Sequence, residues 1–270
     1  MKKKKGTLHL GTLLSVAALL LVSGSTAEAL DVQPARLELT IEADQPYRGT
    51  IDVSNRSQKA VNVQIATGAY RFFQPGVNVP SAQTWFTFEP EQFSLAPLSS
   101  SKVSYLITPP ANIRNDTAGE YLAALLIDEL PAPQENRQAS RITLVPRFAL
   151  PVYVTIHGRE RIDVEISQVS VRAGQSSGLL RVDTTLANHG TVHVRPTGTL
   201  ALLDAHKEIL QAYPLGKALP LLPSATLRIP TAVPLPPVGR YEAIVTVESH
   251  SGNVLQKQLS FEVTADGQVH

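Results

Sequence analysis

The sequence predicts an all-β protein, and three observations support this. The chain has 270 residues, of which 43% are hydrophobic and only 17% are charged, as suits a protein with a sizeable core. It contains 20 prolines, and proline breaks helices but is tolerated in turns and edge strands. From Asp31 onward, apolar and polar residues alternate in short runs that Pro, Gly and Asn interrupt. This composition excludes a disordered or collagen-like chain. The absence of Cys excludes a disulfide scaffold, a thiolate zinc site and a cysteine nucleophile.

Residues 1–29 have the pattern of a cleavable signal peptide. Four lysines follow Met1, an apolar run extends from Leu10 to Val22, and Ala27-Glu28-Ala29 forms an A-x-A cleavage site. The alternative is a membrane anchor, but the apolar run is shorter than the ~18 to 20 residues that a span needs. We therefore expect cleavage after Ala29 and export to the periplasm, or alternatively secretion or display at the cell surface.

Removal of residues 1–29 changes the charge of the chain. Lys plus Arg fall from 24 to 20 and Asp plus Glu from 23 to 22, so the formal charge changes from +1 to −2. The mature chain has no basic stripe, which argues against nucleic acid as a partner.

The first half of the mature chain contains seven predicted strands, the number in an immunoglobulin-like sandwich. They are Val32–Ile41, Gly49–Ser54, Val61–Ala66, Thr84–Phe88, Lys102–Thr108, Glu120–Ile127 and Arg141–Ile156. The second half contains seven more. These are Ile162–Val171, Leu179–Ala187, Val192–Leu203, Lys207–Gln211, Ala225–Ile229, Arg240–Glu248 and Val254–Val263. We expect two tandem sandwiches, at residues 30–157 and 158–270, joined through the polar break 157–160.

Two short sequence echoes relate the halves. Asn55 and Asn188 each follow a strand, where Asn or Gly suits a turn with positive φ. Gly119-Glu120-Tyr121 recurs as Gly239-Arg240-Tyr241 at the start of each sixth strand, where a tyrosine-corner hydroxyl would bond back to the backbone.

No catalytic constellation is visible in the sequence. An enzyme needs a nucleophile, a base and an orienting acid, or clustered carboxylates, and we find neither set. His189 and His193 are four residues apart, which would align them on a helix but not across a turn and a strand. We expect them to be a solvent-exposed pair. The sequence therefore predicts no enzyme, no cofactor and no metal site.

The last predicted strand of the first half is unusually long. Every even position from 142 to 156 is apolar: Ile142, Leu144, Pro146, Phe148, Leu150, Val152, Val154 and Ile156. Strands usually have about five or six residues. Pro146 and Pro151 lack an amide donor and so favour an edge position. One interpretation is an ordinary core face that continues towards the second domain. The other is an edge kept open for a partner's sheet, to which it would supply hydrogen bonds and apolar side chains.

The sequence resembles the PapD-like periplasmic chaperones of pilus and fimbrial assembly. The resemblance lies in the signal peptide, Val32-Gln33-Pro34-Ala35-Arg36, Gly49 to Asn55 and the long alternating strand. It covers residues 31–157, and the second domain matches by fold only. The resemblance implies two immunoglobulin-like domains in a boomerang. It also implies a cleft where an arginine and a lysine bind the C-terminal carboxylate of a subunit.

Carried over to this chain, the cleft arginine is Arg36. The lysine position falls at Ala149, and Arg147 is the nearest cation, so Arg36 and Arg147 are the expected carboxylate anchors. The expected client contacts on the donor strand are Ile142, Leu144, Phe148, Leu150 and Val152.

The resemblance thus implies a non-enzymatic periplasmic chaperone that stabilises incomplete β-sandwich subunits by donor-strand addition. Its partners would be pilin-like subunits and an outer-membrane usher. The alternative is a surface or matrix accessory protein, or an adhesin, built of two sandwiches. An exported hydrolase ranks third because no catalytic set is visible.

Overall fold

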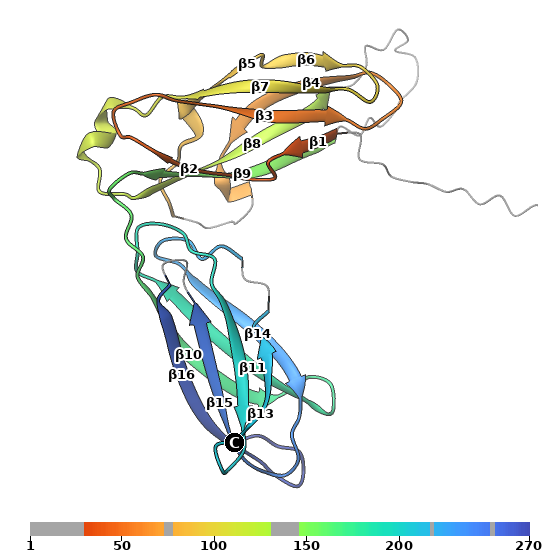
Figure 1. Ribbon diagram of the computed structural model, residues 1–270, viewed down its shortest axis with the longest axis vertical. Helices are drawn as coiled ribbons and strands as arrows, with labels where there is room; N and C mark the ends of the chain where they lie inside the picture. Colours follow the sequence, from red (N-terminus) through yellow and green to blue (C-terminus); the bar gives the residue numbers. More distant parts are fainter. Residues whose placement is uncertain (1–29, 73–77, 131–145, 217–218, 249–251) are drawn as a thin grey trace, which may run out of the picture.

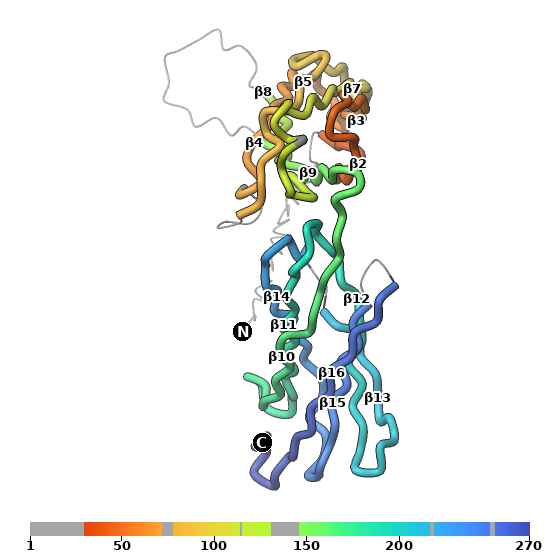
Figure 2. The backbone as a smooth tube through the Cα atoms, turned by 90° about the vertical axis from the view of Figure 1, so that its left-hand side faces the viewer, coloured from red at the N-terminus to blue at the C-terminus, as the bar shows by residue number. Residues whose placement is uncertain are grey.

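The computed structural model describes residues 30–72, 78–130, 146–216, 219–248 and 252–270. The described chain forms two β-sandwiches that meet at an elbow (Figure 1), and a view turned by 90° shows them stacked end to end (Figure 2). The prediction of an all-β protein with two sandwiches is confirmed. The predicted signal peptide lies outside the described residues. Within the described part, no helix has the length and apolar character needed to cross a membrane.

The first sandwich packs a four-stranded sheet against a five-stranded sheet. The first sheet has the order β1 (Leu30–Gln33), β3 (Tyr47–Asn55), β7 (Ser100–Ile107) and β5 (Phe86–Glu89). The second has the order β2 (Leu37–Ile41), β9 (Arg147–Ile156), β8 (Glu120–Leu130), β4 (Val61–Gly68) and β6 (Gln92–Leu95). Three short 3₁₀ turns join the strands: η1 (Tyr70–Phe72), η2 (Gln83–Trp85) and η3 (Ala111–Asn115).

The second sandwich packs three strands against four. One sheet has the order β10 (Val164–Ala173), β11 (Leu179–Asn188) and β14 (Thr226–Pro234). The other has the order β13 (Ile209–Pro214), β12 (Thr197–Leu203), β15 (Gly239–Glu248) and β16 (Val254–Val263). Residues 157–163 link the two sandwiches between β9 and β10.

Each sandwich has its own apolar core between its two sheets. Ile51 and Val103 of one sheet face Leu125 and Val154 of the other in the first domain, and all four are fully buried. Alternation along each strand produces this arrangement, since one face of the strand packs inward. A third, smaller cluster lies at the elbow, where Tyr70, Leu122 and Tyr153 of the first domain enclose Leu222 of the second.

The first predicted strand, Val32–Ile41, is two strands. The chain bends at Pro34 to Arg36, so that β1 pairs with β3 in one sheet and β2 pairs with β9 in the other. The buried positions are even before the bend, at Leu30 and Val32, and odd after it, at Leu37 and Ile41, so the change of sheet coincides with a change in the phase of alternation.

Several strand boundaries also differ from the prediction. β12 begins at Thr197 instead of Val192, because Pro196 lacks the amide that would continue the ladder, and Val194 makes only an isolated bridge with Leu221. The short strand β6 was not predicted. Positions 141–145 of the long predicted strand lie outside the described residues, and β9 begins at Arg147.

The echoed asparagines are equivalent, but not for the predicted reason. Neither Asn55 nor Asn188 has positive φ. Both are buried, and their side-chain amides hold loops: Asn55 Nδ2 donates to the carbonyls of Lys59 and Ala96, and Asn188 Nδ2 donates to that of Leu221.

The echoed tyrosines differ from each other. The Tyr241 hydroxyl donates to the backbone carbonyl of Pro237 at 2.9 Å, which confirms a tyrosine corner there. The Tyr121 hydroxyl instead donates to the Asp116 carboxylate at 2.6 Å. That hydrogen bond lowers the pKa of Asp116, whereas burial raises the pKa of Tyr121 well above its usual range.

Candidate functional site

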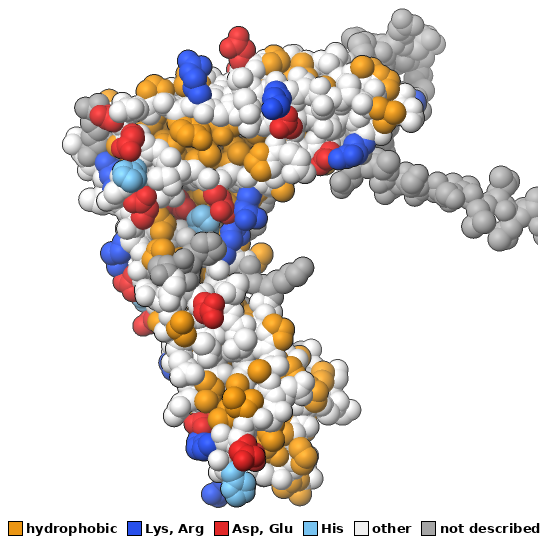
Figure 3. All heavy atoms as spheres, in the orientation of Figure 1, with side chains coloured by type: hydrophobic (Ala, Val, Ile, Leu, Met, Phe, Trp, Pro, Cys, Tyr) orange, Lys and Arg blue, Asp and Glu red, His pale blue; other side chains and the backbone are white. Residues whose placement is uncertain are grey.

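The candidate site is a cleft at the elbow, formed by both domains. A hollow of about 430 Å³ lies between them. It is lined by Ala35, Arg36, Tyr70, Pro151, Tyr153, Arg195, Leu219 and Pro220, and we call it the cleft. A second hollow of about 320 Å³ adjoins it and shares Tyr153 and Arg195 with it. Basic, acidic and histidine side chains gather on the surface where the sandwiches meet (Figure 3).

Local folding brings the cleft residues together. Arg36 lies in the bend between β1 and β2, beside the point where Leu37 pairs with Val152 of β9. Pro151 and Tyr153 are at odd positions of β9 and so lie on the face opposite the core residue Val152. Arg195 comes from the second domain, in the segment that precedes β12.

One carboxylate faces two arginines in the cleft. Glu38 Oε1 lies 2.7 Å from Arg36 Nε and 3.0 Å from a nitrogen of Arg195. The Arg195 guanidinium also lies over the Tyr153 ring, 5.3 Å from its centroid, as a cation–π contact. Two guanidiniums thus share one carboxylate, and the Arg36 side chain is 53% exposed.

The pKa directions agree with this charge balance. Burial alone would raise the pKa of Glu38, but hydrogen bonding and charge from Arg195 lower it. Burial opposes the charged form of Arg195, yet its hydrogen bond with Glu38 raises the pKa of the guanidinium. Glu38 and Arg195 are therefore both ionised at neutral pH.

A buried tyrosine pair forms the floor of the cleft. The hydroxyls of Tyr70 and Tyr153 are 2.7 Å apart and their rings meet edge to face. Both residues are at least nine-tenths buried. Burial, followed by the hydrogen bond with Tyr153, raises the pKa of Tyr70 well above its usual range, so this phenol stays protonated and can donate a hydrogen bond.

A buried hydrogen-bond network joins the two domains at the cleft. The Glu120 side chain of β8 is fully buried; one of its oxygens accepts a hydrogen bond from the backbone amide of His193, and the other lies against the ring Nδ1 of the same residue. The His193 ring stacks on Tyr153 at 4.0 Å. A buried carboxylate without such partners would be strongly destabilising. The expectation of a solvent-exposed histidine pair is therefore wrong for His193, whose side chain is only 12% exposed, but correct for His189 at 57%.

The linker is also tied to both domains. Arg159 Nη1 donates to the Ile113 carbonyl at 2.9 Å, and the Thr191 hydroxyl donates to the Arg159 carbonyl at 2.6 Å. Gly190 must be glycine here, because a Cβ would come 2.2 Å from the Arg161 carbonyl oxygen.

β9 is covered on one side for only half of its length. It pairs with β8 throughout, but β2 covers its other side only from Val152 to Ile156. Among the described residues, no strand pairs with this other side between Arg147 and Pro151. We call this segment the open edge. It leads directly into the cleft, which Pro151 also lines.

The hydrogen bonds between β8 and β9 show which residues of β9 direct their backbone N–H and C=O groups at the open edge. The amide of Glu129 donates to the carbonyl of Pro146, and the amide of Ile156 donates to that of Gly119, so even positions of β9 point their backbone groups at β8. In an antiparallel ladder the odd positions then point away. The N–H group that Pro151 lacks would therefore point at the open edge. Its absence removes no hydrogen bond between β9 and β8, which is the usual situation of a proline in an edge strand.

The structure brings together only some of the predicted site residues. Arg36 lies in the cleft. Arg147 lies four residues before Pro151, roughly 13 Å along the strand. It forms two hydrogen bonds with Asp128, at 2.6 and 2.8 Å. The structure therefore does not place Arg36 and Arg147 side by side.

The predicted client contacts differ in burial, and two of them lie outside the described residues. Leu150 and Val152 are buried in the core of the first domain, and Phe148 is partly buried against it. Ile142 and Leu144 lie outside the described residues.

Sequence reasoning missed the second arginine of the cleft. Arg195 belongs to the other domain, 159 positions after Arg36, and no local pattern connects them. Tyr153 could have been noticed, since it is the single aromatic residue at an odd position of β9.

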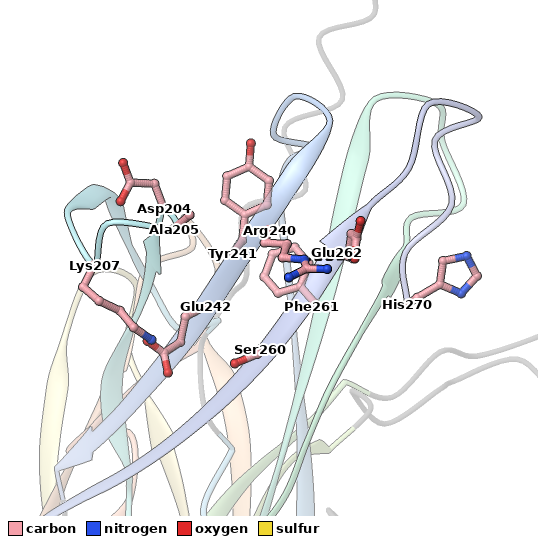
Figure 4. Close-up of a pocket in the computed structure, with 10 residues that line it drawn as sticks. All are labelled: Asp204, Ala205, Lys207, Arg240, Tyr241, Glu242, Ser260, Phe261, Glu262 and His270. Atoms are coloured by element: carbon pink, nitrogen blue, oxygen red, sulfur yellow. Dashed lines mark hydrogen bonds and ion pairs between the residues drawn. The ribbon is translucent and has the colours of Figure 1, made fainter.

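Another hollow lies elsewhere, at the far end of the second domain. It measures about 480 Å³ and is lined from β15, β16, the loop at 204–207 and His270 (Figure 4). Its charges are already paired, Lys207 with Glu242 and Arg240 with Glu262. It contains no part of the open edge, so we assign it no role in the site.

Comparison with known proteins gives a likeness in solved structures only. No protein-family model and no curated protein sequence matches the chain. The chain is similar to the Escherichia coli chaperone DraB, at 13% identity and a TM-score of 0.43, covering 86% of this chain and 96% of DraB. It is also similar to a chain in the complex of Salmonella enterica SafA pilin with the SafB chaperone, at 14% identity and 0.44, with 85% and 96% covered. A third is the Pseudomonas aeruginosa CupB2 chaperone, at 16% and 0.44, with 84% and 98% covered. Because these sequence identities and TM-scores are low, the function of the chain has to be inferred from its own residues.

Proposed function

We propose that this protein is a non-enzymatic periplasmic chaperone that binds incomplete β-sandwich subunits by strand addition. The observation that carries the proposal is the open edge of β9, which leads into a cleft with two arginines. An unpaired edge offers main-chain hydrogen bonds to a partner that lacks a strand. Pilin-like subunits are the partners of this kind that the family resemblance implies, with an outer-membrane usher receiving the complex.

The cleft would hold the C-terminal carboxylate of the client. Arg36 and Arg195 can both donate to a carboxylate, because a guanidinium presents paired N–H groups that match its oxygens. The bound carboxylate would take over Arg36 from Glu38. That exchange is inexpensive, since an exposed ion pair contributes only about 0–1 kcal/mol. In this proposal the second carboxylate anchor is Arg195, and not Arg147 as expected from the sequence.

The open edge would align the client beside β9. Phe148, together with Leu144 and Ile142 ahead of it, would enter the client's apolar groove. Leu150 and Val152 point into the core, where they hold the donated strand in place. At the end of the open edge that is far from the cleft, Arg147 of β9 forms an ion pair with Asp128 of β8.

Co-expression with candidate subunits in the periplasm tests the proposal. The wild-type chain should form a one-to-one complex with pilin-like subunits encoded beside it. Arg36→Ala and Arg195→Ala should each weaken capture by about tenfold or more, as expected for loss of a hydrogen bond to a charged group. Phe148→Glu should abolish capture.

Arg240→Ala provides the matched control, because Arg240 is an exposed arginine that also pairs with a glutamate but lies far from the cleft. If Arg240→Ala weakens capture as much as Arg36→Ala does, or if all variants bind normally, the proposed mode of binding is wrong. Failure of the wild-type chain to capture any subunit would favour the surface-accessory alternative.

A further inference from the structure

A cluster of arginines lies on the outer face of the second domain, away from the cleft. Asp183 at the centre of β11 is surrounded by Arg181 on the same strand, Arg172 on β10 and Arg228 on β14. We call these four residues the arginine cluster. The strand registers place them on one face, since Arg172 is opposite Arg181 and Asp183 lies between Ser170 and Pro230.

The three arginines share one carboxylate. Arg181 Nε lies 2.9 Å from Asp183 Oδ1, and nitrogens of Arg228 and Arg172 lie 2.5 and 3.2 Å from Oδ2. The Asp183 side chain is only 1% exposed, whereas those of Arg172 and Arg228 are each 53% exposed. The aspartate is thus covered by the arginines, and two of the guanidiniums stay open to solvent.

The cluster carries an excess of positive charge. Burial would raise the pKa of Asp183, but the hydrogen bonds from Arg228 and Arg181 lower it, so the aspartate is ionised at neutral pH. One negative charge faces three positive ones. The neighbouring positions on this face are uncharged: Gln168, Ser170, Thr185, Pro230 and Ala232. The next charged residues along the face, Glu165 and His189, pair with each other.

Stabilisation of the sheet does not require this arrangement. A single arginine neutralises a single aspartate, and each further guanidinium brings repulsion between like charges. An added anion would relieve that repulsion, and its carboxylates could receive the N–H groups that Arg172 and Arg228 still present to solvent.

We propose that the arginine cluster is a docking site for an acidic, extended segment of a partner protein. Nitrogens of Arg172 and Arg228 contact the same oxygen, Asp183 Oδ2, so the two guanidiniums lie close together although they come from different strands. Carboxylates at alternate positions of an extended chain are about 7 Å apart and reach both arginines through their side chains. The residues on the face beside Asp183 are uncharged, and most of them are small: Ser170, Thr185, Pro230 and Ala232. This site is independent of the cleft and of the function proposed for it.

A membrane surface fits the cluster less well. Each basic residue near an anionic bilayer contributes only about 1 kcal/mol. The cluster has three, and the chain after residue 29 has a formal charge of −2. Strong membrane attachment would need a larger basic surface.

Peptide binding to the full mature chain tests the proposal. The probes are a fluorescein-labelled peptide of alternating Asp and Thr and a matched peptide of alternating Asn and Thr, followed by fluorescence anisotropy. We expect the Asp peptide to bind at least about tenfold more tightly than the Asn peptide, with an affinity that falls as salt increases. The double variant Arg172→Ala/Arg228→Ala should lose about tenfold or more of the Asp-peptide affinity. Arg240→Ala should bind the Asp peptide like the wild type.

Other outcomes overturn the proposal. They are equal binding of the two peptides, loss of binding in Arg240→Ala as large as in the double variant, and absence of binding by the wild-type chain. Inorganic phosphate that displaces the peptide at equal concentration would show a general anion site instead. Tighter binding to phosphatidylglycerol vesicles than to the peptide would show a membrane site. An unchanged melting temperature of the double variant ensures that a loss of affinity comes from the arginines and not from unfolding.

Discussion

Buried polar side chains in the second domain fall into two groups. Asn188 is 1% exposed and its amide is engaged on both sides, because Nδ2 donates to two carbonyls and Oδ1 accepts from Gly190. Thr184 and Thr231 are also buried, but their hydroxyls have no hydrogen-bond partner among the described residues. A buried polar group without a partner costs about 1–3 kcal/mol. The hydrogen-bonded side chain of Asn188 helps to specify the fold, whereas the unpaired hydroxyls of Thr184 and Thr231 lower the free energy of unfolding.

Replacement of Thr231 by valine should therefore stabilise the protein. Valine keeps the branched shape and removes the unpaired hydroxyl, so we expect the free energy of unfolding to rise by about 1 kcal/mol. Thr226→Val on the same strand is the control, because Thr226 is exposed. Urea denaturation of both variants is the measurement. A Thr231→Val variant less stable than the wild type would contradict the expectation.

At the scale of elements, β9 combines two functions through its alternation. Its even positions fill the core of the first domain, and its odd positions contribute Pro151 and Tyr153 to the cleft. The sequence predicted the core face correctly, because alternation is a local signal. The single predicted strand Val32–Ile41 missed the change of sheet at Pro34 to Arg36, because it joined two short runs whose apolar positions change there from even to odd.

Pro151 should protect the open edge from unwanted pairing. Pro151→Ala restores an amide on that side of β9 and leaves the ladder with β8 intact. We expect the variant to remain folded but to self-associate more as concentration increases, as followed by analytical ultracentrifugation. Pro97→Ala, at an exposed turn position outside the strands, serves as the control. A Pro151→Ala variant that stays as monomeric as the wild type would show that the proline has no such role.

At the scale of the whole molecule, the elbow depends on contacts that sequence patterns do not show. Arg36 could be anticipated from a family resemblance, because it lies in a local motif. Arg195, His193 and Glu120 could not, because their roles arise where residues of different domains meet. The number and order of strands follow from hydrophobic periodicity, but the contacts between domains require three-dimensional coordinates.

The buried histidine should hold the angle between the domains. His193→Ala removes the ring that pairs with Glu120 and stacks on Tyr153, leaving a buried carboxylate with fewer partners. We expect small-angle X-ray scattering to show a larger radius of gyration or a broader distance distribution.

His189→Ala is the control for this prediction, since His189 is exposed, lies four positions away and is paired only with Glu165 at 3.4 Å among the ion pairs described for it. The same scattering change in both variants, or in neither, would contradict a specific role for His193.

The composition of the cleft from two domains has a consequence for quality control. Arg36 and Arg195 meet only in a molecule in which both sandwiches have folded and docked. A newly exported or truncated chain presents one arginine without the other. Folding and docking of both domains are therefore a condition for the existence of the two-arginine cleft, so an unfinished copy lacks the site proposed to bind the client's carboxylate.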